Sequence, residues 1–300
     1  MSSTPAKLRH NQGTSVTLID KFKLPLTQLT HPHLYTMASH HVLLLGGHGK
    51  IAQLLTPLLL KRSWTVTSVI RTSEQTPAIE KLGAGLPGKL NVLVRSIEDV
   101  TSQDKALSIL NEVKPDYIAW SAGAGGRGGA ERTFKVDRDA AVHFINAAAS
   151  VPTITKFLLI SYLASRRSGA SWWPAGEWDE YNEKVNNGVL ANYYKAKIEA
   201  DETLYKVSKK SPTLVGIDLR PGTLTDDPAT KVEFGKTKSI AKNGVSREAV
   251  AEVASQLLAA DGVKNGWYDL LDGDEDIPAA VERVVRENVD AAEGEAIYDA

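Results

Sequence analysis

Short runs rich in leucine and β-branched residues alternate with longer stretches of helical periodicity from His41 onward. This alternation is typical of a parallel sheet with helices covering both faces. Strands are expected at His41–Leu45, Thr65–Ile70, Asn91–Arg95, Asp116–Trp120, Lys156–Ser161, Thr213–Leu219 and Trp267–Leu271. Helices are expected at Lys50–Lys61, Ser102–Val113, Ala130–Ala149, Ala191–Ser208, Arg247–Ala259 and Pro278–Asn288. The pattern predicts a Rossmann-type, doubly wound α/β domain over residues 41–300, in which the residues after Leu219 form a small C-terminal lobe on the substrate side.

Residues 1–40 lack this pattern and contain many Ser and Thr, four Lys/Arg and a single acid, Asp20. We expect a disordered leader without a catalytic role, although its composition also has some features of a mitochondrial presequence. Met37 is one of two methionines and is an alternative start. The expected location is cytoplasmic, or mitochondrial if residues 1–36 are a presequence.

The overall composition narrows the possible partners. A formal net charge of -1 offers no basic surface for nucleic acid. The absence of cysteine excludes disulfides and thiolate chemistry. No apolar run approaches the roughly 20 residues of a membrane helix, and the seven scattered histidines do not indicate a metal site. We therefore expect a small-molecule substrate, while the oligomeric state does not follow from the sequence.

A glycine-rich turn follows the first predicted strand and opens the first predicted helix. It consists of Gly46, Gly47, His48, Gly49, Lys50, Ile51 and Ala52. Strand, turn and helix in this order are typical of dinucleotide binding, because Gly46 can form the tight turn and Gly49 lets a pyrophosphate approach the helix N-terminus. A nucleoside-triphosphate P-loop is excluded, because Leu44 and Ile51 stand where that motif needs Gly and Ser or Thr. A glycine turn that binds nothing is the alternative.

The second predicted strand ends at Arg71, without the acid that NAD-binding versions place there to hold the ribose hydroxyls. Arg71 can form charge-assisted hydrogen bonds to a 2′-phosphate, with His48 or Lys50 as helpers. An ordinary solvated arginine is the alternative. The expected cofactor is NADP(H), with NAD(H) as the second choice.

Candidate acid–base residues follow the fifth predicted strand. Tyr193 and Lys197 are four residues apart on a predicted helix, so that both lie on one face and the ammonium can favour the phenolate. Such a tyrosine can exchange a proton with a substrate oxygen while hydride moves to or from nicotinamide, and Ser161 can orient that oxygen. The alternative is a half-buried tyrosine beside a surface lysine.

Together these motifs resemble the short-chain dehydrogenase/reductase superfamily, in its atypical or extended NAD(P)-binding branch related to epimerases and dehydratases. The resemblance covers roughly residues 41–290 and includes two further turns, at 121–126 after the fourth strand and at 219–222 after the sixth. It implies that Ala122 and Gly123 lie beside the cofactor and that Pro221 lies at its nicotinamide end. Both turns also have an interpretation as packing alone.

The sequence departs from the family pattern at three places. Asp137 stands where an asparagine is common in the family. Leu163, two positions after Ser161, cannot form a hydrogen bond to a substrate, and residues 162–192 form a long insert. Within this insert the aromatic segment Ser171–Tyr181 predicts a loop. The loop either forms a hydrophobic wall over the nicotinamide that accepts a planar or apolar substrate, or its aromatics hold it to the surface or to a second subunit.

Three functions remain open. The first is an NADP(H)-dependent oxidoreductase acting on a carbonyl or alcohol. The second is a non-catalytic NAD(P)-binding regulator or assembly factor. The third is an epimerase or dehydratase that oxidises and re-reduces its substrate.

Overall fold

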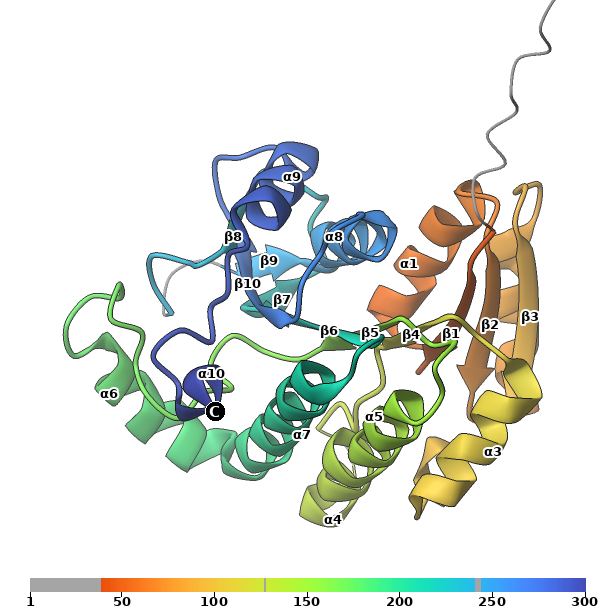
Figure 1. The fold of residues 1–300 in the computed structure, drawn as a ribbon, viewed down its shortest axis with the longest axis horizontal. Helices are drawn as coiled ribbons and strands as arrows, with labels where there is room; N and C mark the ends of the chain where they lie inside the picture. The colour runs from red at the N-terminus through yellow and green to blue at the C-terminus, as the bar shows by residue number, and fades with distance from the viewer. Residues whose placement is uncertain (1–38, 127, 241–243) are drawn as a thin grey trace, which may run out of the picture. The chain divides into compact units, whose positions relative to one another are not determined.

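The computed structural model describes residues 39–126, 128–240 and 244–300, which belong to one compact unit of the chain (Figure 1). The predicted leader lies outside the described residues except for its last two positions.

The centre of this unit is an eight-stranded sheet in the order β3-β2-β1-β4-β5-β6-β10-β8. Its strands are β1 (His41–Leu45), β2 (Thr65–Ile70), β3 (Lys89–Val94), β4 (Tyr117–Trp120), β5 (Lys156–Ile160), β6 (Val215–Pro221), β8 (Val232–Gly235) and β10 (Gly266–Asp272). All neighbours pair in parallel except β8, which runs antiparallel to β10 at the edge. The order reverses between β1 and β4, and in such sheets ligands bind outside the carboxyl ends of the strands at that point.

Helices cover both faces of the sheet (Figure 1). On one face lie α1 (Lys50–Lys61), α8 (Arg247–Ala259) and α9 (Ile277–Glu287); on the other lie α3 (Gln103–Val113), α4 (Gly129–Thr133), α5 (Ala141–Ala149) and α7 (Ala191–Lys210). The shorter elements are η1 (Ser73–Gln75), α2 (Thr76–Glu80), η2 (Lys81–Gly83), η3 (Ile97–Asp99), the π-helical η4 (Phe134–Ala140) and η5 (Asn182–Val189), α6 (Glu177–Tyr181) and α10 (Ala296–Asp299).

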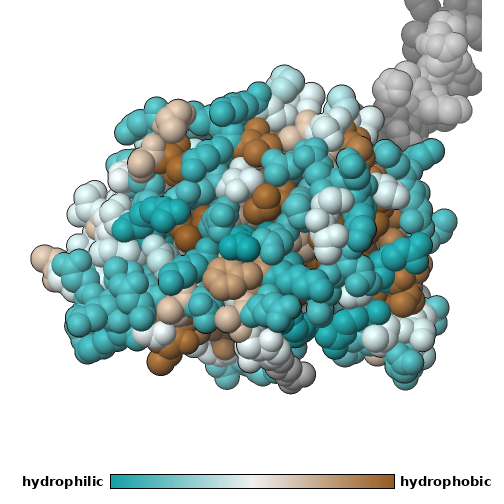
Figure 2. Space-filling model, turned by 90° about the horizontal axis from the view of Figure 1, so that it is seen from below, coloured by the Kyte–Doolittle hydropathy of each residue, from teal (hydrophilic) through white to brown (hydrophobic). Residues whose placement is uncertain are grey.

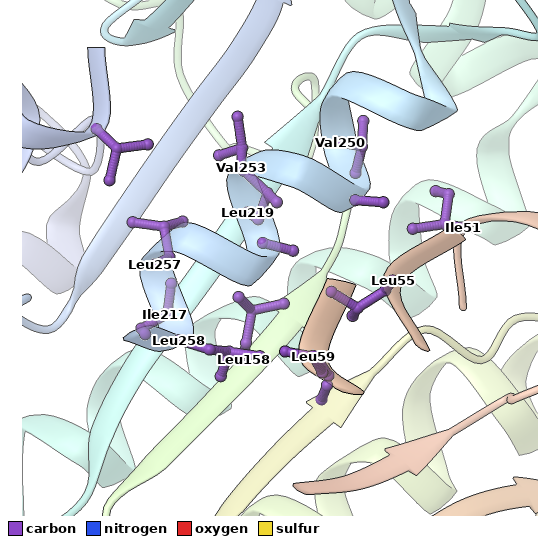
Figure 3. Close-up of a cluster of buried hydrophobic side chains, with 14 of the residues drawn as sticks. Ile51, Leu55, Leu59, Leu158, Ile217, Leu219, Val250, Val253, Leu257 and Leu258 are labelled. Carbon is purple, nitrogen blue, oxygen red and sulfur yellow. The ribbon is translucent and has the colours of Figure 1, made fainter. Parts of the chain in front are cut away.

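Central strands such as β5 contribute to two apolar cores, because their side chains alternate between the faces. Leu158 of β5 packs toward α1 and α8, whereas its neighbours Phe157 and Leu159 join the core under α3, α5 and α7. Figure 3 shows the first core, to which α1 contributes Leu55, α8 contributes Val253 and β5 contributes Leu158. The face of the molecule in Figure 2 is mostly hydrophilic, with scattered apolar residues, as is usual for a protein surface.

The structure confirms the fold class predicted from the sequence. Strands β1 and β2 and helices α1 and α8 have the predicted bounds. The residues after Leu219 add β10 and β8 to the main sheet and form a small parallel sheet from β7 (Thr223–Thr225) and β9 (Gly244–Ser246).

The aromatic insert differs from the prediction. A loop was expected throughout Ser171–Tyr181, but Glu177–Tyr181 is helical and continues into η5. Gly176 starts this helix in the left-handed conformation, with φ at 81°. The first helical turn carries three acids, which suit the positive end of the helix dipole. The sequence did not predict the start of this helix, because the three tryptophans of the segment are not spaced as on one face of a helix.

Candidate functional site

The glycine turn lies where β1 ends, at the reversal of strand order. Gly46 has φ at 84°, and its amide neighbour Gly47 donates to the Val69 carbonyl at 2.8 Å. Gly49 donates to the carbonyl of Gly46 at 2.8 Å and closes the turn. The turn after β4 packs directly against this loop, since a Cβ on Gly46 would lie 2.6 Å from the Cα of Ala122. Two of the predicted cofactor segments are therefore in contact.

The N-terminus of α1 faces the same region and is free to receive an anion. The described residues give α1 no side-chain cap, and its first turn carries no acid. Orphan amides and the positive end of a helix dipole favour phosphate groups. A Cβ on Gly49 would lie 3.1 Å from the Gly46 carbonyl, so a larger residue would narrow the cradle. These features fit a pyrophosphate.

A cavity of about 420 Å³ extends from this turn along the ends of β2, β3 and β4. Seven predicted cofactor residues line it: Gly46, His48, Gly49, Lys50, Arg71, Ala122 and Gly123. Two others, Gly47 and Ile51, are buried beside it. Ile51 belongs to the core under α8 (Figure 3), and the Cα of Gly47 faces Ser68 so closely that a Cβ would lie 1.8 Å from its Oγ. Gly47 and Ile51 therefore pack the turn against the sheet and the core and do not line the cavity.

The cavity also has lining residues that the sequence analysis missed. They are Gln75, Arg95, Ser96, Ile97, Glu98 and Arg132, together with apolar Val69, Ile70 and Val136. Most of the polar ones follow β3, which pairs in parallel with β2. The available signal was topological, because parallel neighbours end at the same edge of a sheet and bring the segment after β3 next to Arg71.

An acid stands beside Arg71 after all. Glu98 accepts a hydrogen bond from Nε of Arg132 at 2.8 Å, and its Oε1 lies 3.6 Å from Nη1 of Arg71. The hydrogen bond from Arg132 and the charges of both arginines hold the pKa of Glu98 below its ordinary value. Glu98 is therefore ionised at neutral pH, and this end of the cavity carries one carboxylate between two guanidinium groups.

Lys50, a predicted helper, is engaged outside the cavity as well. Its Nζ lies 2.6 Å from Asp226, which also pairs with Arg247 at 2.7 Å. Both Lys50 and Asp226 are largely exposed. The lysine stands at the mouth of the cradle and links α1 to the segment after β7.

The predicted acid–base residues lie beyond the end of β5, and none of them is among the described residues that line the cavity. The hydroxyl of Ser161 donates to Asp201 at 2.7 Å, in the buried layer between β5 and α7. Nζ of Lys197 donates to the Ile160 carbonyl at 3.0 Å, and the side chain is 1% exposed. Lys197 also compensates the charges of Asp137 and Asp201. Ser161 and Lys197 are thus tied to the β5–α7 contact.

Tyr193 is partly buried beside Tyr162, with 5.2 Å between their ring centroids. Burial raises the pKa of the Tyr193 phenol well above its ordinary value, and the charges of Asp137 and Asp201 raise it further. This differs from the expectation that Lys197 favours the phenolate. The physical reason is that burial of the phenol, the largest cause, disfavours its charged form, and the charges of Asp137 and Asp201 add to this effect. Tyr193 is a protonated phenol at neutral pH.

Asp137 connects these residues to the cofactor side. It lies in the π-helical η4, is almost completely buried, and accepts a hydrogen bond from the amide of Ala124 at 2.9 Å. A Cβ on Gly123 would meet its Oδ1 at 2.9 Å. The carboxylate therefore fixes the turn after β4, which lines the cavity.

The turn at 219–222 is held from within the fold. Arg220 is completely buried, donates to Asp269 at 3.0 Å, and its guanidinium lies 3.9 Å from the ring centroid of Trp267. It also donates to the carbonyls of Leu163 and Ser165, at 2.9 and 2.7 Å. Pro221, the predicted nicotinamide neighbour, is buried at the end of β6 and outside the described lining of the cavity. Arg220 orders the loop that follows β5.

Glu295, near the C-terminus, fastens the next part of that loop. Its carboxylate accepts from the amides of Arg167 and Ser168 at 3.0–3.2 Å and lies 3.4 Å from Nε of the buried Arg166. Glu295 itself is 3% exposed. The segment after β5 is therefore shaped by residues that come more than 100 positions later in the chain.

The aromatic insert packs on this loop and not over the described cavity. Trp173 is buried and donates from its indole nitrogen to the Thr237 carbonyl at 2.8 Å, while Trp178 lies 6.2 Å from it, between ring centroids. Glu177 accepts from Ser239 at 2.6 Å and from the amide of Ile240 at 3.1 Å. Of the alternatives for this segment, the contacts favour one in which its aromatics pin it to the domain.

Two further properties concern the described part of the chain. Its histidines and acids form no cluster of three or more that could hold a metal ion. None of its helices combines the length and apolar character needed to cross a bilayer.

Comparison with known proteins identifies the family of this chain. The sequence model of the NAD(P)H-binding family matches residues 46–261, from the glycine turn to the end of α8. A UPF0659 protein of Schizosaccharomyces pombe is 31% identical over 240 residues, covering 79% of this chain and 91% of that protein. The uncharacterized sugar epimerase YhfK of Bacillus subtilis is 29% identical over 244 residues, covering 81% and 99%.

A putative NAD-dependent epimerase/dehydratase from Bacillus halodurans has a similar solved structure, with a TM-score of 0.63. It is 24% identical, and the match covers 82% of this chain and all of that one. At this level of identity the structural similarity supports only the fold. The evidence for a dinucleotide cofactor is the family match and the uncapped N-terminus of α1. The chain belongs to the NAD(P)H-binding family, and this supports a nicotinamide dinucleotide as its cofactor.

Proposed function

We propose that this protein is an NADP(H)-dependent oxidoreductase that reduces a carbonyl group to an alcohol. The observation that carries the proposal is the cavity that joins the uncapped N-terminus of α1 to Arg71 at the end of β2. A pyrophosphate at α1 directs the adenosine half of a dinucleotide toward the ends of β2 and β3. Arg71 lines that end of the cavity and is about half exposed, so its guanidinium is accessible to a 2′-phosphate.

The NADP(H) assignment is tested by Arg71→Ala. A charge-assisted hydrogen bond contributes about 1.5–3 kcal/mol, so NADPH affinity should fall by roughly ten- to a hundredfold while NADH affinity changes little. Binding is measured by titrating protein into each reduced cofactor and following its fluorescence. Arg286→Ala on α9 is the matched control, because Arg286 is similarly exposed and lies outside the described cavity lining. Equal losses for both cofactors would remove the 2′-phosphate from Arg71.

For the chemical step, NADPH supplies the hydride when it is bound. The proposal assigns the proton to Tyr193, whose phenol carries its proton at neutral pH. The raised pKa makes this phenol a weaker acid, so the proton moves as the arriving hydride turns the substrate oxygen into a strong base. Lys197, fixed on Ile160, balances the carboxylates of Asp137 and Asp201 as the phenol loses its proton. Ser161 was expected to orient the substrate oxygen; its hydroxyl has to turn away from Asp201 to do so.

Tyr193→Phe tests the catalytic half with a panel of aldehydes and ketones and NADPH oxidation as the signal. We expect turnover to fall by about 10²–10⁴-fold, the usual contribution of a general acid, with NADPH affinity retained. Tyr181→Phe, in the insert, controls for the loss of a hydroxyl. Unchanged turnover would refute the role of Tyr193. Cofactor binding without turnover of any substrate would favour the regulator, and substrate conversion without net NADPH oxidation would favour an epimerase, the activity in the name of the Bacillus subtilis relative.

A further inference from the structure

The adenosine end of the cavity contains an arrangement that neither cofactor preference alone explains. In sheets of this type a specificity-setting acid stands at the end of β2, where this chain has Arg71. Glu98 comes from the turn η3 after the neighbouring strand β3, yet its carboxylate reaches the same place. The site therefore contains both Arg71, a cation that can bind a 2′-phosphate, and Glu98, an acid that can pair with the same arginine.

Glu98 is held there by more than its contact with Arg71. Arg132 donates to Glu98 at 2.8 Å, and through Nη1 to the Ala124 carbonyl at 3.0 Å. Side-chain exposure is 27% for Glu98 and 23% for Arg132, but 55% for Arg71. The Glu98–Arg132 pair is thus the fixed part of the arrangement, and Arg71 is the more exposed guanidinium that approaches it.

The charges set up a competition. A 2′-phosphate that pairs with Arg71 has to lie near the carboxylate of Glu98, whose negative charge both repels the phosphate and attracts Arg71. A ribose 2′-hydroxyl meets no such repulsion and can donate a hydrogen bond to the carboxylate. Glu98 therefore opposes the effect of Arg71 on the choice of cofactor.

We propose that Glu98 is a specificity-determining residue that limits the preference for NADPH over NADH by competing with the 2′-phosphate for Arg71. This inference rests on the proposed role of Arg71. It assigns the cofactor preference to an Arg71–Glu98 pair donated by two adjacent strands.

The test is Glu98→Gln, which removes the charge and keeps an oxygen for Arg132. We expect NADPH affinity to rise by about two- to fivefold, the range of a partly exposed ion pair, and NADH affinity to stay the same or fall. Glu282→Gln on α9 removes an equivalent charge outside the described cavity lining and should change neither affinity. An NADPH-to-NADH affinity ratio that is unchanged or lower in Glu98→Gln would overturn the proposal.

Combining this variant with Arg71→Ala separates the two proposals. If both hold, Glu98→Gln raises the NADPH preference only while Arg71 is present. If Arg71→Ala selectively weakens NADPH but Glu98→Gln leaves the ratio unchanged, the 2′-phosphate assignment stands and the role of Glu98 is wrong. If Arg71→Ala weakens both cofactors equally, the assignment to Arg71 fails, whatever Glu98→Gln does. Far-ultraviolet circular dichroism of each variant checks that the fold is retained.

Discussion

Replacement of Gly46 by alanine perturbs the contact between the two turns that form the cofactor cradle. Alanine at φ of 84° costs roughly 1–2 kcal/mol, because its Cβ approaches the following carbonyl. The added Cβ would also lie 2.6 Å from Cα and 2.7 Å from N of Ala122, and both are backbone atoms that cannot rotate away. Overpacking of this kind costs a further 1–3 kcal/mol or so. We expect a total loss of about 2–5 kcal/mol.

Gly85 offers a matched control for the backbone strain. It has φ at 72°, and a Cβ there would meet no atom within 4 Å. Gly85→Ala should therefore cost only the strain, about 1–2 kcal/mol. The difference between the two variants isolates the approach of the Gly46 turn to the Ala122 turn.

The assay is urea unfolding followed by tryptophan fluorescence, with thermal unfolding as a second measure. About 1 kcal/mol shifts Tm by roughly 2–4 °C in a domain of this size, so a difference of about 2 kcal/mol separates the variants by several degrees. NADPH affinity should fall in Gly46→Ala and stay constant in Gly85→Ala. Equal loss of stability in both variants would refute the close contact.

Two further changes test the buried charges behind the site. Burial, and then the charge of Asp201, raise the pKa of Asp218 well above its ordinary 3.8. The folded state therefore holds this proton more tightly than the unfolded state does. The contribution of Asp218 to the free energy of unfolding is fully present below about pH 3.8 and is lost as pH rises toward the raised pKa. Asp218→Asn should abolish that loss, so its Tm relative to wild type should increase between pH 5 and pH 9, with Asp274→Asn as the exposed control. A constant difference for Asp218→Asn would contradict the raised pKa. Arg220→Met should lower the free energy of unfolding by about 3–5 kcal/mol, because it leaves Asp269 buried without its partner. Adding Asp269→Asn should restore part of it in urea titrations, and simple additivity of the two losses would argue against the pair.

The sequence was sufficient where local patterns and the parallel sheet agree. The strand His41–Leu45, the glycine turn and α1 were predicted with their observed bounds, because a buried strand that runs into small residues and an amphipathic helix has few other solutions. The edge strand β8 was not predicted. It has four residues, and its place depends on antiparallel pairing with β10, which follows it by some 30 positions.

The site divides in the same way. Arg71 and the glycines were predicted because they adjoin predicted strand ends. Glu98 was not predicted, because it approaches Arg71 only when β2 and β3 pair in parallel and end side by side. The effect of Lys197 on Tyr193 was predicted from their spacing alone. The pKa of Tyr193 is instead raised by burial first and then by the charges of Asp137 and Asp201, and both causes depend on the tertiary fold.

The grip of Glu295 on residues 166–168 has a consequence for how the protein is made. Ribosomes release a chain from its N-terminus, and domains begin to fold during synthesis. Strands β1 to β5 and the cradle they carry can assemble early, since their partners have already emerged. The loop after β5 obtains its carboxylate clamp only when Glu295, which follows Ser168 by 127 positions, has left the exit tunnel. The nucleotide half of the molecule can thus exist before its opposite half is ordered, and a nascent chain stalled before residue 295 should retain an open loop there.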